Sequence, residues 1–147
     1  MILVKEYAAL PALVGRRLPA LGESLALTCG RTYRLSRALL DPGPGRLLVR
    51  GRFTRVIDDL APHERHVLLD LLADPDPAVL LIVDPRPSIR TAGAIQNAYN
   101  VSLLQAETPA AAVSYDWPIR FADAASTTPS VRQAADELGV DLETITP

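Results

Sequence analysis

The segment from Asp84 to Arg90 carries the residue types best suited to binding a small anion. Asp84 follows the most apolar run of the sequence, and Ser88 is placed to begin a helix. Strand ends and first helical turns are common phosphate sites in α/β proteins, and Arg86, Ser88 and Arg90 would supply the contacts. No glycine-rich loop accompanies them, so we interpret the segment first as a capped helix with solvated charges. A small-anion or nucleotide sensor is the alternative.

Histidine and cysteine are the other residue types that commonly bind metals or act as nucleophiles. His63 and His66 flank Glu64 in the first turn of a predicted amphipathic helix, where we expect them to be solvated. Two histidines and one cysteine are too few for a zinc cluster, and we expect Cys29 to be a small core residue. Any bound metal would therefore be a hard ion held by oxygen.

The charge of the whole chain does not favour nucleic acid. The formal net charge is −2 at pH 7, but charge can still be concentrated locally. Four arginines occur without an acid among them: Arg46, Arg50, Arg52 and Arg55. We interpret this run as a solvated strand-and-turn surface, with an edge that contacts phosphate as the alternative.

Strands and helices alternate through most of the sequence. Short apolar runs predict strands at Met1–Val4, Leu25–Cys29, Ala78–Val83, Ile119–Ala122 and Val140–Ile145. Apolar spacing predicts helices at Tyr7–Val14, Arg31–Leu40, Asp59–Asp74, Ser88–Tyr99 and Ser130–Leu138. Asp58 and Asp59 are expected to cap the third of these helices. The alternation predicts an α/β fold, a three-layer α/β/α sandwich with a mainly parallel central sheet.

The helix boundaries in the second half follow from individual residues. Asn100 is expected to end one helix in a left-handed conformation, and Gly139 another. The segment Val101–Tyr115 is rich in alanine but contains Pro109. It is therefore either one kinked helix or a turn followed by a helix that starts at Thr108.

The length and composition predict one domain. A chain of 147 residues with 48% hydrophobic content can bury a sizeable core, and we assign residues 1–147 to a single domain. Apolar stretches such as Ala78–Val83 are far shorter than the roughly 20 residues of a membrane span. No basic and then apolar leader is evident, so we expect a cytosolic protein.

Four strings of sequence carry a resemblance to a known family. Met1–Leu10 is an apolar run followed by an Ala/Leu-rich segment, Ala98–Glu107 contains Ser-Leu-Leu-Gln-Ala, and Trp117–Asp123 leads from a strand to an acid. Val131–Val140 then ends in Leu-Gly-Val. In these strings and in the order of its elements, most of the chain resembles the PIN domain, best known from VapC-type toxins of toxin–antitoxin pairs.

The resemblance implies a site of acidic residues, which this sequence alters. In PIN domains, three or four carboxylates meet at the carboxyl ends of the parallel strands and hold Mg²⁺ or Mn²⁺, which activates water to hydrolyse RNA. By resemblance, Asp123 retains the last acid, whereas Lys5 and Gln105 replace aspartates. Arg34 and Arg37 occur where a glutamate is expected. A cation and a neutral amide are expected to weaken binding of such an ion.

Two further acids bear on whether the site survives. Glu6 follows Lys5, and Glu107 lies two residues after Gln105; a shifted strand end or a helix kink would turn either inward. Acids at such positions are more often ordinary surface residues. In the opposite arrangement, Lys5 pairs with Asp123 and closes the former metal site.

These observations give one leading hypothesis and two alternatives. The first is a PIN-like domain with impaired or lost ribonuclease activity, which acts by binding a small antitoxin-like protein or by forming a homodimer. The second is an active Mg²⁺- or Mn²⁺-dependent endoribonuclease that uses Asp123, Glu107 and Glu6 in a shifted site. The third is the anion or nucleotide sensor at Asp84–Arg90.

Overall fold

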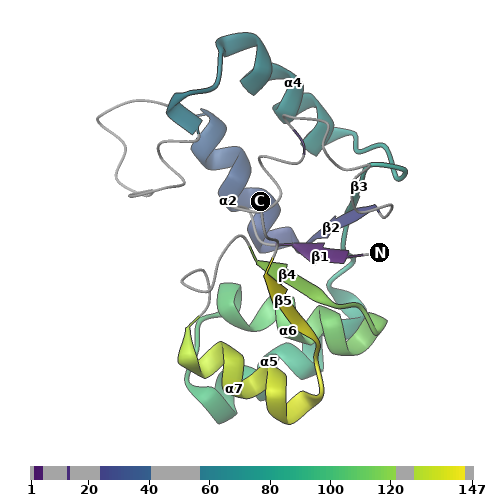
Figure 1. Cartoon of the computed structure of the whole chain (residues 1–147), viewed down its shortest axis with the longest axis vertical. Coiled ribbons are helices and arrows are strands. Elements are labelled where there is room, and N and C mark those ends of the chain that lie inside the picture. The colour runs from purple at the N-terminus through teal and green to yellow at the C-terminus, as the bar shows by residue number, and fades with distance from the viewer. Residues whose placement is uncertain (1, 5–12, 14–23, 41–56, 122–127, 145–147) are drawn as a thin grey trace.

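The elements alternate as an α/β chain in which helix predominates over strand. A computed structural model describes residues 2–4, 13, 24–40, 57–121 and 128–144 (Figure 1). The strands are β1 (Ile2–Val4), β2 (Leu25–Leu27), β3 (Leu80–Ile82), β4 (Ile119–Phe121) and β5 (Leu142–Thr144). The helices are α2 (Cys29–Leu40), α4 (Pro62–Ala73), α5 (Ile89–Tyr99), α6 (Leu103–Tyr115) and α7 (Pro129–Leu138), with the 3-10 turn η2 (Arg86–Ser88) before α5.

The five strands form one parallel sheet. Their order is β3-β2-β1-β4-β5, and each neighbouring pair runs parallel. β1 lies at the centre, where Leu3 is in register with Ala26 of β2 on one side and Ile119 of β4 on the other. The strand order therefore reverses beside β1. In open α/β sheets, the carboxyl edge at such a reversal is the usual place for a ligand.

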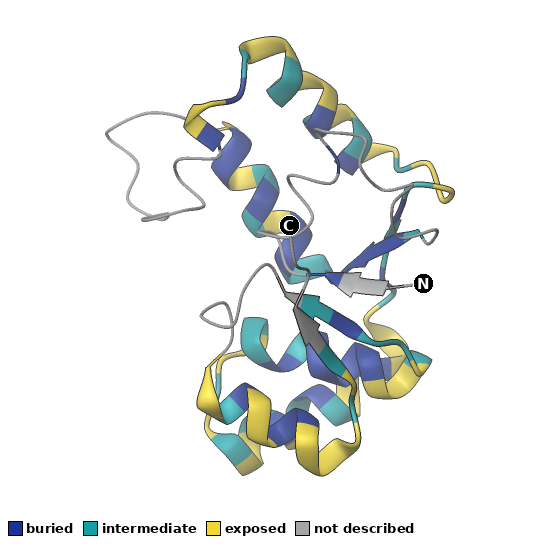
Figure 2. Ribbon diagram, viewed as in Figure 1, coloured by how far each residue is buried: buried dark blue, intermediate teal, exposed yellow. Residues whose placement is uncertain are grey.

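Helices lie on both sides of the sheet (Figures 1 and 2). α2 and α4 lie on one side, and α5, α6 and α7 lie on the other. β2 shows how one strand serves both faces: Leu25 and Leu27 pack in a cluster with Leu35 of α2, whereas Ala26 packs in a cluster with Ala111 of α6. All three residues of β2 are fully buried. Burial on two faces explains why such strands are continuously apolar.

Small side chains let the three helices of the second face approach closely. Ala106 and Ala110 of α6 are fully buried and cluster with Ala92 and Ile95 of α5 and with Ala134 of α7. Alanine at these contacts lets the axes of the three helices lie close together.

Several predicted helix boundaries are confirmed. α5 ends at Tyr99 and is followed by Asn100 in the left-handed conformation with φ 50°. α7 is followed by Gly139 with φ 69°, the backbone conformation that favours glycine. Of the two arrangements open for Val101–Tyr115, the structure has one helix that contains Pro109.

The predicted start of the third helix is wrong. α4 begins at Pro62, and its N-cap is Ala61 rather than Asp58 or Asp59. The Glu64 side chain accepts a hydrogen bond from the Ala61 backbone N–H at 3.0 Å, so an acid within the first turn satisfies this end of the helix.

The predicted helix Tyr7–Val14 lies outside the described residues except for helical Leu13, and the arginine run from Arg46 to Arg55 lies wholly outside them. Within the described ranges, each helix is too short or too polar to cross a membrane.

Candidate functional site

The strands that lead to two of the predicted site residues are neighbours. Lys5 directly follows β1, and Asp123 comes two residues after β4. The register of these strands pairs Val4 with Arg120. Lys5, Glu6 and Asp123 themselves lie outside the described residues, so their predicted roles remain predictions.

Gln105 helps to cap the start of α6. Its backbone N–H donates to the Ser102 hydroxyl at 3.2 Å, and its side-chain Oε1 accepts from the Ser102 backbone N–H at 3.0 Å. These two bonds form a capping box, in which each residue satisfies a backbone donor at the helix start. The amide oxygen is therefore engaged in capping the start of α6, at a position where the PIN resemblance expects an aspartate.

Glu107 reaches across to the first turn of α2. Its Oε2 accepts a hydrogen bond from the Gly30 backbone N–H at 2.9 Å, although the two residues are far apart in sequence. The first turn of α2 contains no acid of its own. Because a helix N-terminus has unsatisfied N–H groups and partial positive charge, the carboxylate of α6 acts as the missing cap of α2.

Gly30 makes this approach possible. A β-carbon at position 30 would overlap the Glu107 carboxylate, whose atoms are the nearest to it. No unusual backbone angle occurs at position 30. Glycine is therefore needed there for the close contact between the two helices, rather than for its conformational freedom.

Arg31 forms a second bridge between the same two helices. It is only 3% exposed, and its guanidinium donates to the backbone carbonyl of Leu104 at 3.0 Å. Glu107 and Arg31 together fix the first turn of α2 against the first turns of α6. Arg34, farther along α2, is half-buried, and Arg37 is exposed.

A pocket of about 290 Å³ lies at the carboxyl ends of β2 and β3. Thr28, Cys29 and Gly30 form its base in the turn from β2 to α2, and Glu107 contributes its carboxylate. Its lining is mainly apolar and is completed by Tyr33, Val83, Pro85, Ser88, Ile89, Ala92, Leu103 and Ala111. Tyr33, Ile89 and Leu103 are 74%, 67% and 55% exposed, so large apolar side chains surround the opening.

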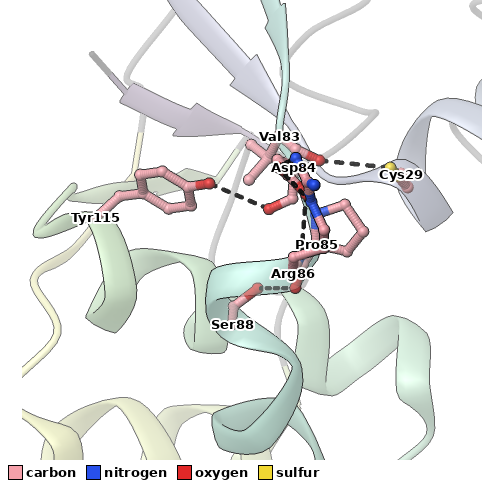
Figure 3. A network of polar contacts seen from close by, with 7 residues as sticks. All are labelled: Cys29, Val83, Asp84, Pro85, Arg86, Ser88 and Tyr115. Atoms are coloured by element: carbon pink, nitrogen blue, oxygen red, sulfur yellow. Dashed lines mark hydrogen bonds and ion pairs between the residues drawn. The ribbon is translucent and has the colours of Figure 1, made fainter.

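Cys29 lies in the wall of this pocket and is held as a thiol. Its Sγ donates to the Val83 carbonyl at 3.4 Å, as Figure 3 shows. Burial raises the pKa of the Cys29 thiol above that of an exposed cysteine, and the negative charges of Glu107 and Asp84 raise it further. Because the thiolate is the nucleophile, Cys29 is poorly suited to nucleophilic catalysis at neutral pH.

This arrangement predicts slow alkylation of Cys29. With iodoacetamide, the rate is expected to rise with pH with a midpoint above that of an exposed cysteine, because deprotonation is suppressed until higher pH. Glu107→Gln should move the midpoint downward, since one of the two negative charges is removed. The Cys29→Ser/Leu40→Cys double variant provides the exposed reference on the same helix. A Cys29 midpoint at or below that reference would contradict the prediction.

In the segment Asp84–Arg90, the charges of Asp84 and Arg86 pair with each other (Figure 3). The Arg86 guanidinium donates to the Asp84 carboxylate at 2.6 to 3.0 Å, and these bonds lower the pKa of that carboxyl. Tyr115 donates to the Asp84 carbonyl at 3.1 Å, and the Ser88 hydroxyl donates to the Pro85 carbonyl at 3.2 Å. Arg86 and Ser88 are thus engaged locally, rather than directed together at a common anion position.

His63 and His66 are both exposed, as expected for the first turns of α4. His66 lies 3.8 Å from Asp70, one turn later on the helix surface. In the part of the chain that the structure describes, no three histidine, cysteine or acidic side chains gather to hold a metal ion.

Comparison with protein-family models gives no match, and comparison with curated proteins gives no significant match.

The pocket was not predicted from the sequence. Sequence reasoning placed Cys29 in the core and gave no role to Gly30, Tyr33 or Leu103. One signal was present: Thr-Cys-Gly directly follows an apolar strand and opens a helix, and that junction lies at the carboxyl edge of a parallel sheet.

Proposed function

We propose that the chain is a PIN-like domain, a three-layer α/β/α sandwich, whose metal-dependent ribonuclease activity is impaired or lost. In this proposal it works in the cytosol by binding a small antitoxin-like protein or a second copy of itself. The parallel sheet with helices on both faces supports the family resemblance at the level of architecture.

The engagement of Gln105 carries the proposal. A metal ligand must direct an oxygen at the ion, and Gln105 instead directs its amide oxygen, which carries no charge to offset that of a cation, at the backbone N–H of Ser102. The capping box gives this residue a structural role at the start of α6, because glutamine is one of the residue types that complete such a box.

The other described donors do not fit a Mg²⁺ or Mn²⁺ site. Glu107 is the one acid of the described residues that lines the pocket, and its Oε2 is bonded to the Gly30 N–H. Hard divalent ions take several oxygens, usually including more than one carboxylate. The residues that α2 places near the expected glutamate position are Arg34 and Arg37, whose charge opposes a cation.

The exposed apolar side chains around the opening of the pocket support a role in binding another molecule. Tyr33, Ile89 and Leu103 are large apolar side chains with more than half of their surface exposed. They belong to three different helices, yet they line one pocket. Apolar surface gathered in this way commonly marks a site of binding.

Measurement of RNA cleavage tests the proposal. The purified chain is expected to cleave a fluorescent RNA no faster than background with either Mg²⁺ or Mn²⁺, because the described donors offer too few charged oxygens. The assay should include Asp123→Asn, which removes the acid retained by resemblance, and Asp136→Asn as a matched change at an exposed position on α7.

Robust turnover that is abolished by Asp123→Asn but kept by Asp136→Asn would overturn the proposal in favour of an active endoribonuclease with a shifted site. Turnover that both variants retain would indicate a contaminating nuclease.

A further inference from the structure

The pocket at the carboxyl ends of β2 and β3 is a place where a small apolar molecule fits. Its volume of about 290 Å³ is near the lower limit of ligand sites, which commonly begin at about 300 Å³. Val83, Ala92 and Ala111 supply buried apolar wall. A strongly polar ligand such as a sugar would find few partners there, because it would lose its hydration without replacing it.

The carboxylate of Glu107 is the one charged group that the described residues contribute to the lining. Its Oε2 accepts from the Gly30 N–H. No lysine, arginine or histidine in the described ranges lies within ion-pair distance of it. A carboxylate in apolar surroundings is stabilised by an opposite charge, and this pocket provides none from its own described wall.

The charged side chain in the described lining is negative. Glu107 raises the pKa of Cys29, whose Sγ donates to the Val83 carbonyl in the same pocket, whereas the charge of Asp84 is paired with Arg86. An anionic ligand would lie beside the Glu107 carboxylate and be repelled. A neutral ligand would gain the apolar contacts but leave the carboxylate without a counter-charge.

The shape and charge of the pocket point to one chemical class. We propose that it binds a small apolar amine, with the ammonium group beside the Glu107 carboxylate and the hydrocarbon body against Val83, Ala92 and Ala111. Tyr33, Ile89 and Leu103 surround the opening and cover the outer part of that body. This site does not depend on the proposed loss of nuclease activity.

Titration with two matched probes tests the site. The full chain is titrated by calorimetry with 2-phenylethylamine and, separately, with 2-phenylethanol, which has the same body but no charge. A charge-assisted hydrogen bond is expected to favour the amine by about 10- to 100-fold in Kd. Glu107→Gln keeps an oxygen for the Gly30 N–H but removes the charge, so the preference should vanish. Asp136→Asn, an exposed change on α7, should leave it intact.

Cys29 provides a second measurement that needs no acidic variant. Because its side chain lines the pocket, bound amine should protect it from iodoacetamide, with half-protection at the Kd found by calorimetry. The proposal is overturned if the amine does not bind, if the alcohol binds as tightly, if Glu107→Gln retains the preference, or if saturating amine leaves Cys29 alkylation unchanged. None of these outcomes alters the result of the RNA cleavage assay, so the two proposals fail separately.

Discussion

Replacement of Leu35 by alanine is expected to lower the free energy of unfolding by about 2–5 kcal/mol. Leu35 is fully buried in the cluster that joins α2 to β2 and α4. The substitution removes apolar contacts and leaves a cavity that its neighbours fill only in part, so both terms act in the same direction. Denaturant unfolding monitored by circular dichroism measures the loss.

Leu40→Ala provides the matched control for Leu35. It is the same chemical change on the same helix, but Leu40 is 68% exposed. Its effect is expected to stay within about 0.5 kcal/mol, as for most surface substitutions. Equal losses at Leu35 and Leu40 would show that α2 does not bury the face described here.

The effect of Gly30→Ala on the free energy of unfolding is expected to change sign with the residue at position 107. In the natural sequence, the new β-carbon displaces the Glu107 carboxylate and breaks its bond to the backbone of α2. Loss of a charge-assisted hydrogen bond costs about 1.5–3 kcal/mol, which exceeds the gain of about 0.5–1 kcal/mol from replacing glycine in a helix. The variant should therefore be less stable than the parent.

In the Glu107→Ala background, the same Gly30→Ala change should instead raise the free energy of unfolding by about 0.5–1 kcal/mol, because only the helix preference remains. Gly93→Ala is the matched control: it lies within α5, and a β-carbon there meets no atom within 4 Å. It should stabilise the protein in both backgrounds. Independent effects at positions 30 and 107 would contradict the proposed contact.

Local signals predicted the helix ends in the second half of the chain. Asn100 and Gly139 end α5 and α7 as expected, because left-handed residues satisfy the last carbonyls of a helix without help from distant elements. Pro109 left two arrangements open. The sequence does not decide between them, since a proline seven residues into a helix is tolerated only when packing compensates, and Pro109 is buried here.

The start of α4 shows where local reasoning was insufficient. Asp58 and Asp59 are favourable caps by residue type, but Pro62 already fixes the first helical turn and Glu64 satisfies the backbone N–H of Ala61. Acids near a helix start compete for the same backbone N–H groups. Which acid accepts the hydrogen bond depends on where the preceding turn places the chain.

The pocket depends on contacts that no local pattern contains. Apolar runs predicted a parallel sheet, but not that β1 would be central or that β2 and β3 would end beside the first turns of α5 and α6. Glu107 and Gly30 meet because the first turns of α2 and α6, which lie on opposite sides of the sheet, come together at its carboxyl edge. From sequence alone, Glu107 has the character of a surface acid, and its role follows from the fold.

The central position of β1 constrains the order in which the nascent chain can fold. β1 is the first described strand to leave the ribosome, but one of its two neighbours, β4, begins only at Ile119. Until then, β1, β2 and β3 can pair only as a half-sheet, with one side of β1 lacking its partner. Such long-range parallel pairing slows folding, and open strand edges promote association between chains. A chain released before Ile119 would lack β4 and β5. It would therefore expose an unpaired edge of β1, the strand that lies at the centre of the complete sheet.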